Sequence, residues 1–315
     1  MNKQVSKEHS LLIAACLFLL SINASFAKQI AITFDDAPLV GNKNMSGLQK
    51  THQIIAHLTD NQVDDALFFV TTGNINSNTD RQRLAAYANA GFHLAHHSHS
   101  HLSANKNSVV KYLEDFDKAN SILESFKGVL KYHRFPFLHY GETAKKRTAI
   151  HAHLAKHNYK IGYVTVDNYD WYINSKFLAA QKAGLNINYD NLGQLYVETL
   201  WAGIQFYDDL AKEHLKRSPK HVLLLHENEL AALYLGKMIE HIRSQGWEII
   251  SPQEAFDDPI SSAYKPAQFH FNKQGRVAAI LDSQGVEKRK LRHPSENTEF
   301  IDKLFSIYQV TKNTD

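Results

Sequence analysis

The alternation of short apolar runs with longer segments of helical periodicity is the feature that most restricts the fold of this chain. Strands that alternate with helices of ten or more residues predict βαβ units and a parallel sheet. About seven such units within roughly 230 residues favour a barrel over an open sheet, although periodicity alone does not close the ring. The predicted strands are Ile30–Phe34, Ala66–Val70, Phe92–Ala95, Val129–Phe135, Lys160–Val166, Val222–Leu225 and Trp247–Ile250, and the predicted helices are Leu48–Thr59, Asp80–Ala90, Val109–Phe126, Ala144–His157, Asn191–Leu215 and Leu230–Gln245.

The segment from Phe256 onward departs from this alternation. Gln268–Asn272 and Arg276–Leu281 are separated by turn residues and have the pattern of a β-hairpin. We therefore divide the mature chain into a barrel over residues 28–255 and a small C-terminal appendage over residues 256–315.

Residues 1–27 have the pattern of a cleaved secretory signal peptide. Two lysines precede the apolar stretch Leu11–Ile22, and Ser25 and Ala27 are small residues at the positions that a signal peptidase reads. The stretch is shorter than the roughly 20 residues of a membrane span, so a transmembrane anchor is the weaker alternative. A lipoprotein signal ending at Cys16 is also disfavoured, because the apolar run continues beyond it. The sequence thus predicts export to the periplasm or the medium, with no membrane span after cleavage.

The single cysteine and the small net charge exclude several classes of site. Cys16 is the only cysteine, so the mature chain would have no disulfide, thiol nucleophile or thiolate metal site. Any metal must then be held by His, Asp or Glu. The formal net charge of +3 is small, and the basic residues are spread along the chain, so nothing indicates nucleic-acid binding. The 19 histidines make a metal site or an acid–base site worth seeking.

Two adjacent carboxylates, Asp35 and Asp36, follow the first predicted strand and precede a turn closed by Pro38. Neighbouring carboxylates cannot both be ionised and buried without a cation. A metal ligand beside a catalytic base accounts for the pair. A solvated turn is the alternative, since Asp is common in turns.

Four histidines, His96, His97, His99 and His101, follow the third predicted strand. His97 and His101 are four residues apart, so they share a face on either a helix or a strand. Two imidazoles and one carboxylate form a three-ligand site with open positions for water, which is typical of catalytic zinc. Non-haem iron accepts the same ligand set, so the ligands do not name the metal. For His99 and His96 the alternative is a solvated loop histidine.

The ends of three further strands supply groups of complementary chemistry. The fourth strand ends in a permanent cation followed by aromatic residues, the fifth in acidic and aromatic residues, and the sixth in a histidine. The parallel strands of a barrel present catalytic residues at their carboxyl ends, so these clusters are expected to meet. They are His133–Phe137, Asp167–Trp171 and Leu224–Asn228.

Five stretches, in order along the chain, carry this chemistry: Thr33–Pro38, His97–His101, Arg134–Phe137, Asp170–Trp171 and Leu224–His226. They resemble the five ordered motifs of the polysaccharide deacetylases, the NodB-homology domain of carbohydrate esterase family 4. The match spans residues 30 to about 255. The resemblance implies an α/β protein with a distorted (β/α)7 barrel of parallel strands. It also implies an enzyme that uses a divalent metal to remove N- or O-acetyl groups from sugar polymers or oligomers.

The resemblance also implies three groups of functional residues. The metal ligands would be Asp36, His97 and His101. The catalytic residues would be Asp35 as general base, Arg134 holding Asp35, His226 as general acid, and Asp170 tuning His226. The substrate-binding residues around the acetyl pocket would be Phe137, Trp171, Leu224 and Pro136. One divalent ion is expected, with Zn²⁺ preferred and Co²⁺, Ni²⁺, Fe²⁺ or Mn²⁺ as alternatives.

Hydrolysis of an acetyl group needs these residue types independently of the resemblance. A divalent metal acidifies a water molecule and polarises the acetyl carbonyl. Asp35 would remove a proton from the water, and the imidazole of His226 would protonate the departing amine. The oxyanion would lie on the metal and on a backbone N–H near Phe137.

Three departures from the family pattern leave the proposed catalytic side chains intact. Ala37 replaces the usual glycine, so this turn must avoid a conformation open only to glycine. Phe137 stands where tyrosine is common, and Glu227 where aspartate is frequent. These departures leave the substrate open between N-acetylated and O-acetylated sugars. The alternative functions are an amidohydrolase or deformylase acting on a small amide, and a catalytically silent carbohydrate-binding barrel.

A long insertion between Asp170 and His226 contains several aromatic residues. They could form a wall of the cleft, but core packing of a long helix is the favoured interpretation. These residues are Tyr189, Tyr196, Trp201, Phe206 and Tyr207.

Overall fold

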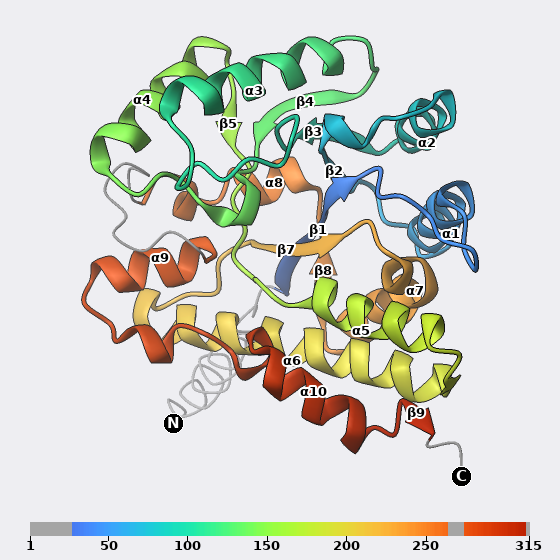
Figure 1. Ribbon diagram of the computed structural model, residues 1–315. Coiled ribbons are helices and arrows are strands. Elements are labelled where there is room, and N and C mark those ends of the chain that lie inside the picture. Colours follow the sequence, from blue (N-terminus) through green and yellow to red (C-terminus); the bar gives the residue numbers. More distant parts are fainter. Residues whose placement is uncertain (1–26, 264–273, 313–315) are drawn as a thin grey trace, which may run out of the picture.

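The computed structural model describes residues 27–263 and 274–312, in which a parallel sheet is surrounded by helices (Figure 1). Among these residues the main sheet has seven strands in the order β5-β4-β3-β2-β1-β7, with β8 also paired to β1, and every pair is parallel. The predicted alternation of strands and helices is therefore confirmed. The strands are β1 (Lys28–Ala37), β2 (Leu67–Val70), β3 (His93–His96), β4 (Val129–His133), β5 (Lys160–Ile161), β7 (His221–His226) and β8 (Trp247–Ile249).

Strand β1 lies at the centre of the sheet because it pairs with three others. Its first residues pair with β8, residues 30–35 pair with β7, and residues 33–37 pair with β2 on the other side. On the far side of the sheet, the segment after β5 runs along β7: the Thr165 N–H donates to the Val222 carbonyl at 3.0 Å, and Val166 bridges to Leu223. The sheet thus curls into the predicted distorted barrel. The predicted strand over residues 160–166 is regular only at its first two residues, β5.

Helices cover the barrel on several sides. Figure 1 shows α1 and α2 on one side, α3 and α4 on a second, and α5, α6, α7 and α10 on a third. Several helices begin at a side-chain cap, as where the Ser46 hydroxyl accepts from the Gln49 N–H in α1. The helices are α1 (Gly47–Asp60), α2 (Asn78–Asn89), α3 (Val109–Leu123), α4 (Ala144–Lys156), α5 (Asp170–Lys182), α6 (Tyr189–Leu215), α7 (Glu229–Ser244), α8 (Pro252–Phe256), α9 (Arg276–Ser283) and α10 (Thr298–Ile307).

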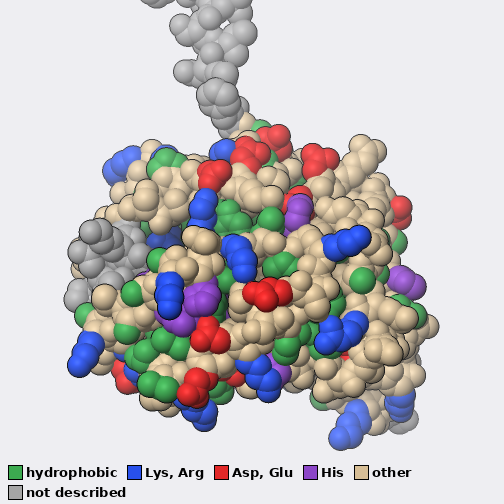
Figure 2. All heavy atoms as spheres, turned by 90° about the horizontal axis from the view of Figure 1, so that it is seen from above, with side chains coloured by type: hydrophobic (Ala, Val, Ile, Leu, Met, Phe, Trp, Pro, Cys, Tyr) green, Lys and Arg blue, Asp and Glu red, His purple; other side chains and the backbone are tan. Residues whose placement is uncertain are grey.

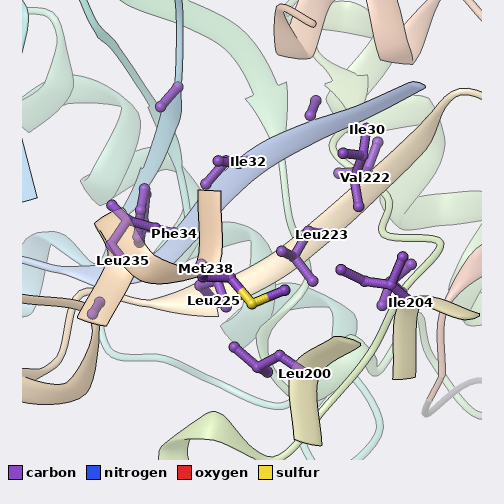
Figure 3. Packing of buried hydrophobic residues seen from close by; sticks show 14 of the residues in the cluster. Ile30, Ile32, Phe34, Leu200, Ile204, Val222, Leu223, Leu225, Leu235 and Met238 are labelled. Carbon is purple, nitrogen blue, oxygen red and sulfur yellow. The ribbon is translucent and has the colours of Figure 1, made fainter. Parts of the chain in front are cut away.

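The core joins β1 and β7 to helices α6 and α7 (Figure 3). Ile32 of β1 and Leu223 of β7 are fully buried with Leu200 of α6 and Met238 of α7. Burying one such side chain contributes roughly 1.5–3 kcal/mol. This packing fixes the two strands whose ends carry the predicted base and acid.

Helix α6 contains most of the aromatic residues of the insertion. Tyr196 and Tyr207 are fully buried, and Trp201 packs its ring edge-on to Trp247 at 5.9 Å between centroids. The core-packing interpretation is therefore confirmed for Tyr196, Trp201 and Tyr207, and it is wrong for Tyr189, which is 47% exposed. The preceding helix α5 was not predicted, and it begins at Asp170 itself.

The C-terminal segment packs against the barrel through helices. The second arm of the predicted hairpin is wrong, because Arg276–Ser283 forms helix α9. Its buried Val277, Ile280 and Leu281 follow helical spacing, and a short apolar run does not by itself distinguish a helix from a strand. The first arm, over residues 268–272, lies outside the described residues. A two-stranded antiparallel sheet of β6 (Asn186–Ile187) and β9 (Thr311–Lys312) ties the end of the described chain to the segment before α6.

Residues 1–26 of the predicted signal peptide, with Cys16, lie outside the described residues. None of the helices within residues 27–263 and 274–312 combines the length and the apolar character needed to cross a bilayer.

Candidate active site

The carboxyl ends of the barrel strands surround one pocket of about 650 Å³. Arg134 and Asp170 are fully buried directly behind Asp35 and His226. Pro136 is buried and is not among the lining residues, so the structure does not bring this predicted substrate residue into the pocket. The predicted site residues that line the pocket are Asp35, Asp36, His97, His101, Phe137, Trp171, Leu224 and His226.

The three predicted metal ligands lie together on one side of the pocket. Asp36, His97 and His101 each offer a ligand atom within 4.8 Å of the other two. Asp36 Oδ1 lies 3.4 Å from His101 Nε2 and 3.8 Å from His97 Nε2. The Thr71 hydroxyl donates to Asp36 Oδ1 at 3.0 Å and orients this carboxylate. Separations of this size suit a divalent ion bound at about 2.1 Å from each atom.

The hydrogen bonding of His97 also suits a metal ligand. Its Nδ1–H donates to the backbone carbonyl of Arg134 at 2.9 Å, which leaves the lone pair of Nε2 toward Asp36. Burial, followed by the charge of His101, holds the pKa of His97 well below its ordinary value. A neutral imidazole with a fixed tautomer is the form that binds a metal. The described residues therefore fit the implied divalent ion.

Asp35 is held by a buried guanidinium rather than by the ligand cluster. Arg134 Nη1 donates to Asp35 Oδ1 at 2.6 Å and to the Thr33 hydroxyl at 2.8 Å. Arg134 is itself fixed by donation to the Gly162 carbonyl at 2.8 Å and by the Phe69 ring at 3.9 Å. The other carboxylate oxygen of Asp35, Oδ2, faces His97 Nε2 at 3.6 Å. One oxygen is thus fixed by Arg134 and the other faces the pocket.

His226 lies across the pocket and is oriented by Asp170. Its Nδ1–H donates to Asp170 Oδ1 at 2.6 Å, and its backbone N–H donates to Asp170 Oδ2 at 2.9 Å. Asn228 also donates to Asp170 Oδ2, at 3.0 Å. Burial lowers the pKa of His226, but the charge and hydrogen bond of Asp170, with smaller contributions from Asp36 and Asp35, outweigh burial and raise it to about 9. A cation bound at Asp36 would offset the carboxylate contributions but not that of Asp170.

Residues with left-handed backbone conformations gather at this site. The φ angles of Asp36, Ser98, His101, Phe137 and Leu138 are 66°, 71°, 53°, 59° and 51°. Non-glycine residues in this region cost free energy and cluster at functional sites. The positive φ falls on Asp36, near the end of β1, so the alanine that follows occupies the family's glycine position without a positive φ.

A buried histidine pair supports the loop that carries His97. The interpretation of His96 as a solvated loop residue is wrong, because this side chain is fully buried. His96 Nε2–H donates to the Phe116 carbonyl at 3.0 Å, and its Nδ1 accepts from the Ser98 N–H at 3.0 Å and from His133 at 2.8 Å. Burial lowers the pKa of His96 to about 4. His99 is half-buried, and its Nδ1 lies 2.9 Å from the Thr72 hydroxyl.

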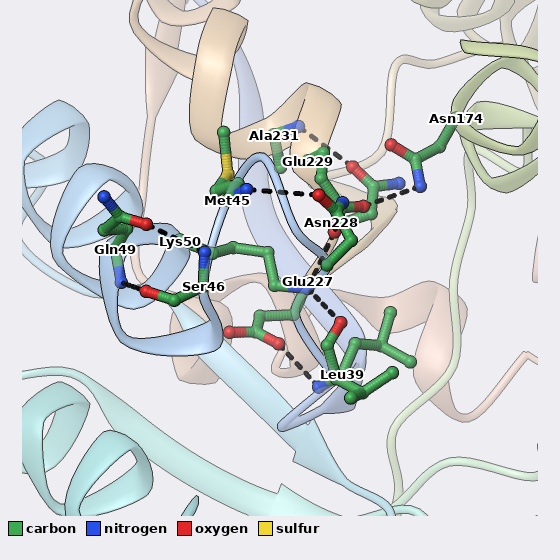
Figure 4. A network of polar contacts seen from close by, with 12 residues as sticks. Leu39, Met45, Ser46, Gln49, Lys50, Asn174, Glu227, Asn228, Glu229 and Ala231 are labelled. Carbon is green, nitrogen blue, oxygen red and sulfur yellow. Dashed lines mark hydrogen bonds and ion pairs between the residues drawn. The ribbon is translucent and has the colours of Figure 1, made fainter. Parts of the chain in front are cut away.

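Two buried carboxylates, Glu227 and Glu229, fix the loop between β1 and α1 beside the pocket (Figure 4). Glu227 accepts from the Leu39 N–H at 2.7 Å and from Arg83 at 2.8 Å. Glu229 accepts from Asn42 of this loop at 3.1 Å and from Asn174 of α5 at 2.9 Å. The glutamate at the position where the family frequently has aspartate is thus engaged in structural hydrogen bonds.

Sequence reasoning missed several pocket residues, among them Asn174 of α5 and Arg292 from the C-terminal segment. The Nε of Arg292 lies 3.6 Å from Glu296 Oε2. Asp167 and Asn228, which belong to the predicted strand-end clusters, also line the pocket. The pKa of Asp167 is raised well above the ordinary value, first by burial and then by the charge of Glu296. No motif marks Arg292, and its segment was assigned to an appendage. Only its position in the fold reveals it.

Comparisons with known proteins are consistent with this site. The family model described as polysaccharide deacetylase matches residues 23–157, which confirms the resemblance over that range. No curated protein matches the chain.

Solved structures of similar fold include members of carbohydrate esterase family 4. A mutant of a family 4 pseudoenzyme is 17% identical, covers 74% of this chain and 68% of its own, and has a TM-score of 0.50, which shows a common fold. The peptidoglycan deacetylase PdaC from Bacillus subtilis is 19% identical, covers 73% and 90% of the two chains, and has a TM-score of 0.47. The family 4 carbohydrate esterase from Streptomyces lividans, solved with acetate, is 19% identical, covers 72% and 95%, and has a TM-score of 0.47.

Proposed function

We propose, from the premise that residues 23–157 belong to the polysaccharide deacetylase family, that this chain is a metal-dependent hydrolase that cleaves the carbon–nitrogen bond of an N-acetylated sugar polymer or oligomer. The proposal rests on three distinct groups of side chains that surround one pocket. These are a cluster of three potential metal ligands, a carboxylate paired with an arginine, and a histidine paired with an aspartate. Each group has a different role in acyl transfer.

Asp36, His97 and His101 would hold the divalent ion, with Zn²⁺ preferred. When bound, the ion would supply a Lewis acid that lowers the pKa of a water molecule and polarises the acetyl carbonyl. Three protein ligands leave coordination positions for the water molecule and the acetyl carbonyl, as in catalytic zinc sites, whereas structural zinc sites have four protein ligands.

Asp35 would act as general base. Its Oδ1 is engaged by Arg134 at 2.6 Å, so Oδ2 is the oxygen available to take a proton from water in the pocket. The fully buried guanidinium keeps the carboxylate oriented and offsets its charge while the proton is transferred.

His226 would act as general acid. Its Nδ1–H is fixed on Asp170, so Nε2 is the atom that reaches the departing amine. The raised pKa, about 9, keeps the imidazole protonated at neutral pH. An amine needs this proton more than an alkoxide does, which favours an amide substrate over an ester.

The aromatic rim supports a sugar substrate. Phe137 and Trp171 are 56% and 44% exposed, although they are large apolar side chains at a pocket mouth. Sugar rings stack on such faces through their apolar C–H surface. Leu224 is only 5% exposed and would contact the acetyl methyl deeper in the pocket.

An acetate-release assay with metal-loaded protein tests the proposal. The substrates are chitin oligomers, peptidoglycan and acetylated xylan, with a small formamide as the competing substrate class. Release of acetate from an N-acetylated sugar is expected. Turnover of the formamide alone would establish the small-amide alternative, and binding to sugars without any release would establish a silent barrel.

Export is proposed on the signal-like residues 1–27. Mass spectrometry of the protein recovered from the periplasm or medium should find a chain that begins near Lys28. An intact Met1, or a lipid on Cys16, would contradict this proposal.

A further inference from the structure

A second cluster of metal-binding side chains lies on the surface that α3 and α4 form, outside the pocket. His153 and His157 are four residues apart along α4 and its C-cap, so their imidazoles share one face. Asp117 of α3 faces them, with Oδ1 at 2.7 Å from His153 Nε2 and 3.9 Å from His157 Nε2. One ligand atom from each residue lies within 4.8 Å of the other two. Figure 2, which looks down on this side of the molecule, shows histidine side chains gathered at the surface.

These separations are close to those of a bound ion. Zinc bonds of about 2.1 Å at tetrahedral angles place ligand atoms roughly 3.4 Å apart. The two measured distances to Asp117 lie on either side of this value, so small side-chain rotations would create the site. A simple hydrogen bond explains the contact between Asp117 and His153. It leaves unexplained why His157 also points its Nε2 at the same oxygen.

The imidazoles of His153 and His157 both pack against one buried aromatic ring. The fully buried ring of Phe116 packs edge-on to His153 at 5.6 Å and to His157 at 6.0 Å between centroids. The histidine side chains are 19% and 33% exposed, and Asp117 is 49% exposed. The ligands are thus partly ordered and still open to an ion from solvent.

We propose that Asp117, His153 and His157 form a second divalent-cation site, of the imidazole and carboxylate class that takes Zn²⁺, Co²⁺ or Ni²⁺. An ion there ties α3 to α4. It also fixes Phe116, whose carbonyl accepts from His96 at 3.0 Å, next to the catalytic loop. Its role is to stabilise that wall of the barrel, and it does not depend on the function proposed for the pocket.

Counting bound ions tests this site separately from the pocket. The full chain is loaded with Zn²⁺, freed of excess ion and measured by elemental analysis, and two ions per chain are expected. A His153→Ala, His157→Ala double variant should keep one ion, and a His97→Ala, His101→Ala double variant should keep the other. A His52→Ala variant, at an exposed position of α1, should keep both.

A conservative substitution of Asp117 controls for the case in which the double variant does not fold. In Asp117→Asn the amide can still hydrogen-bond to His153 but is a poorer metal ligand, so the second ion should bind at least about tenfold more weakly. The rise in Tm on adding Zn²⁺ should also be smaller in this variant. A folded double variant of His153 and His157 that binds as many ions as the full chain would overturn the proposal. A pocket that binds its ion but turns over no sugar would leave it standing.

Discussion

The pairing of Asp170 with His226 gives the sharpest test of the catalytic assignment. In Asp170→Asn the side chain keeps its volume but loses the charge that, together with the 2.6 Å hydrogen bond, raises the pKa of His226. The pKa should fall toward its ordinary value of about 6.5. Burial, then opposed only by the smaller contributions of Asp36 and Asp35, acts in the same direction.

The size of the effect depends on pH. If the pKa of His226 falls from about 9 to about 6.5, the protonated fraction at pH 8 falls from about 0.9 to about 0.03, roughly 30-fold. At pH 6 the same change lowers it by less than about twofold. A cation bound at Asp36 lowers the pKa of His226 in both proteins and keeps the direction of the difference.

The assay is kcat/KM for acetate release between pH 5.5 and 9.5 with metal-loaded proteins. The variant should lose its activity at a lower pH than the parent. Equal metal content and an unchanged Tm would show that folding and the ion are intact, and Asp60→Asn at an exposed site serves as the control. A deficit of the same size at pH 6 and pH 8, or no deficit at all, would refute the role of His226 as a proton donor tuned by Asp170.

Three further outcomes follow from the same geometry. Asp35→Asn should keep the metal and lose about 10² to 10⁴ in rate, whereas Asp36→Asn should lose the metal; the reverse pattern of metal content would mean that the two carboxylates are exchanged. Glu227→Gln should destabilise the fold by about 2 kcal/mol in urea unfolding, because the buried guanidinium of Arg83 loses one of its two carboxylate partners and keeps only Asp80, and an unchanged unfolding midpoint would contradict this. The raised pKa of His226 should stabilise the metal-free fold by about 3 kcal/mol below pH 6.5, and this contribution should disappear as pH rises through about 9; unfolding at pH 6 and pH 9.5 measures it.

The sequence located the chemistry because strand ends are marked locally. Apolar runs such as Ile30–Phe34 are followed at once by polar residues, and a parallel barrel brings all its strand ends to one face. The order of the elements therefore predicted that one of the two carboxylates would meet His97 and His101, and the family resemblance implied that this carboxylate is Asp36. That the three atoms lie within 4.8 Å agrees with it.

Local sequence pattern was insufficient to predict structure where burial or contacts between distant residues determine the conformation. Val277, Ile280 and Leu281 satisfy a helix, but an apolar run of that length reads equally well as a strand, and only docking onto the barrel selects α9. His96 shares its local sequence with His99, and a solvated loop residue was an interpretation of both, yet the fold stacks the His96 ring on Phe116. Nothing along the chain predicts this.

The sequence by itself determined the alternation of elements, and with it the position of the predicted base, acid and metal ligands near strand ends, because hydrophobic periodicity acts over a few residues. The pairings of Arg134 with Asp35 and of Asp170 with His226 were expected only from the family resemblance, and tertiary structure alone placed Arg292 at the pocket wall. Asp35 and Arg134 are 99 positions apart, and His226 and Asp170 are 56 apart. Contacts across such separations depend on how the barrel closes, which no local pattern encodes.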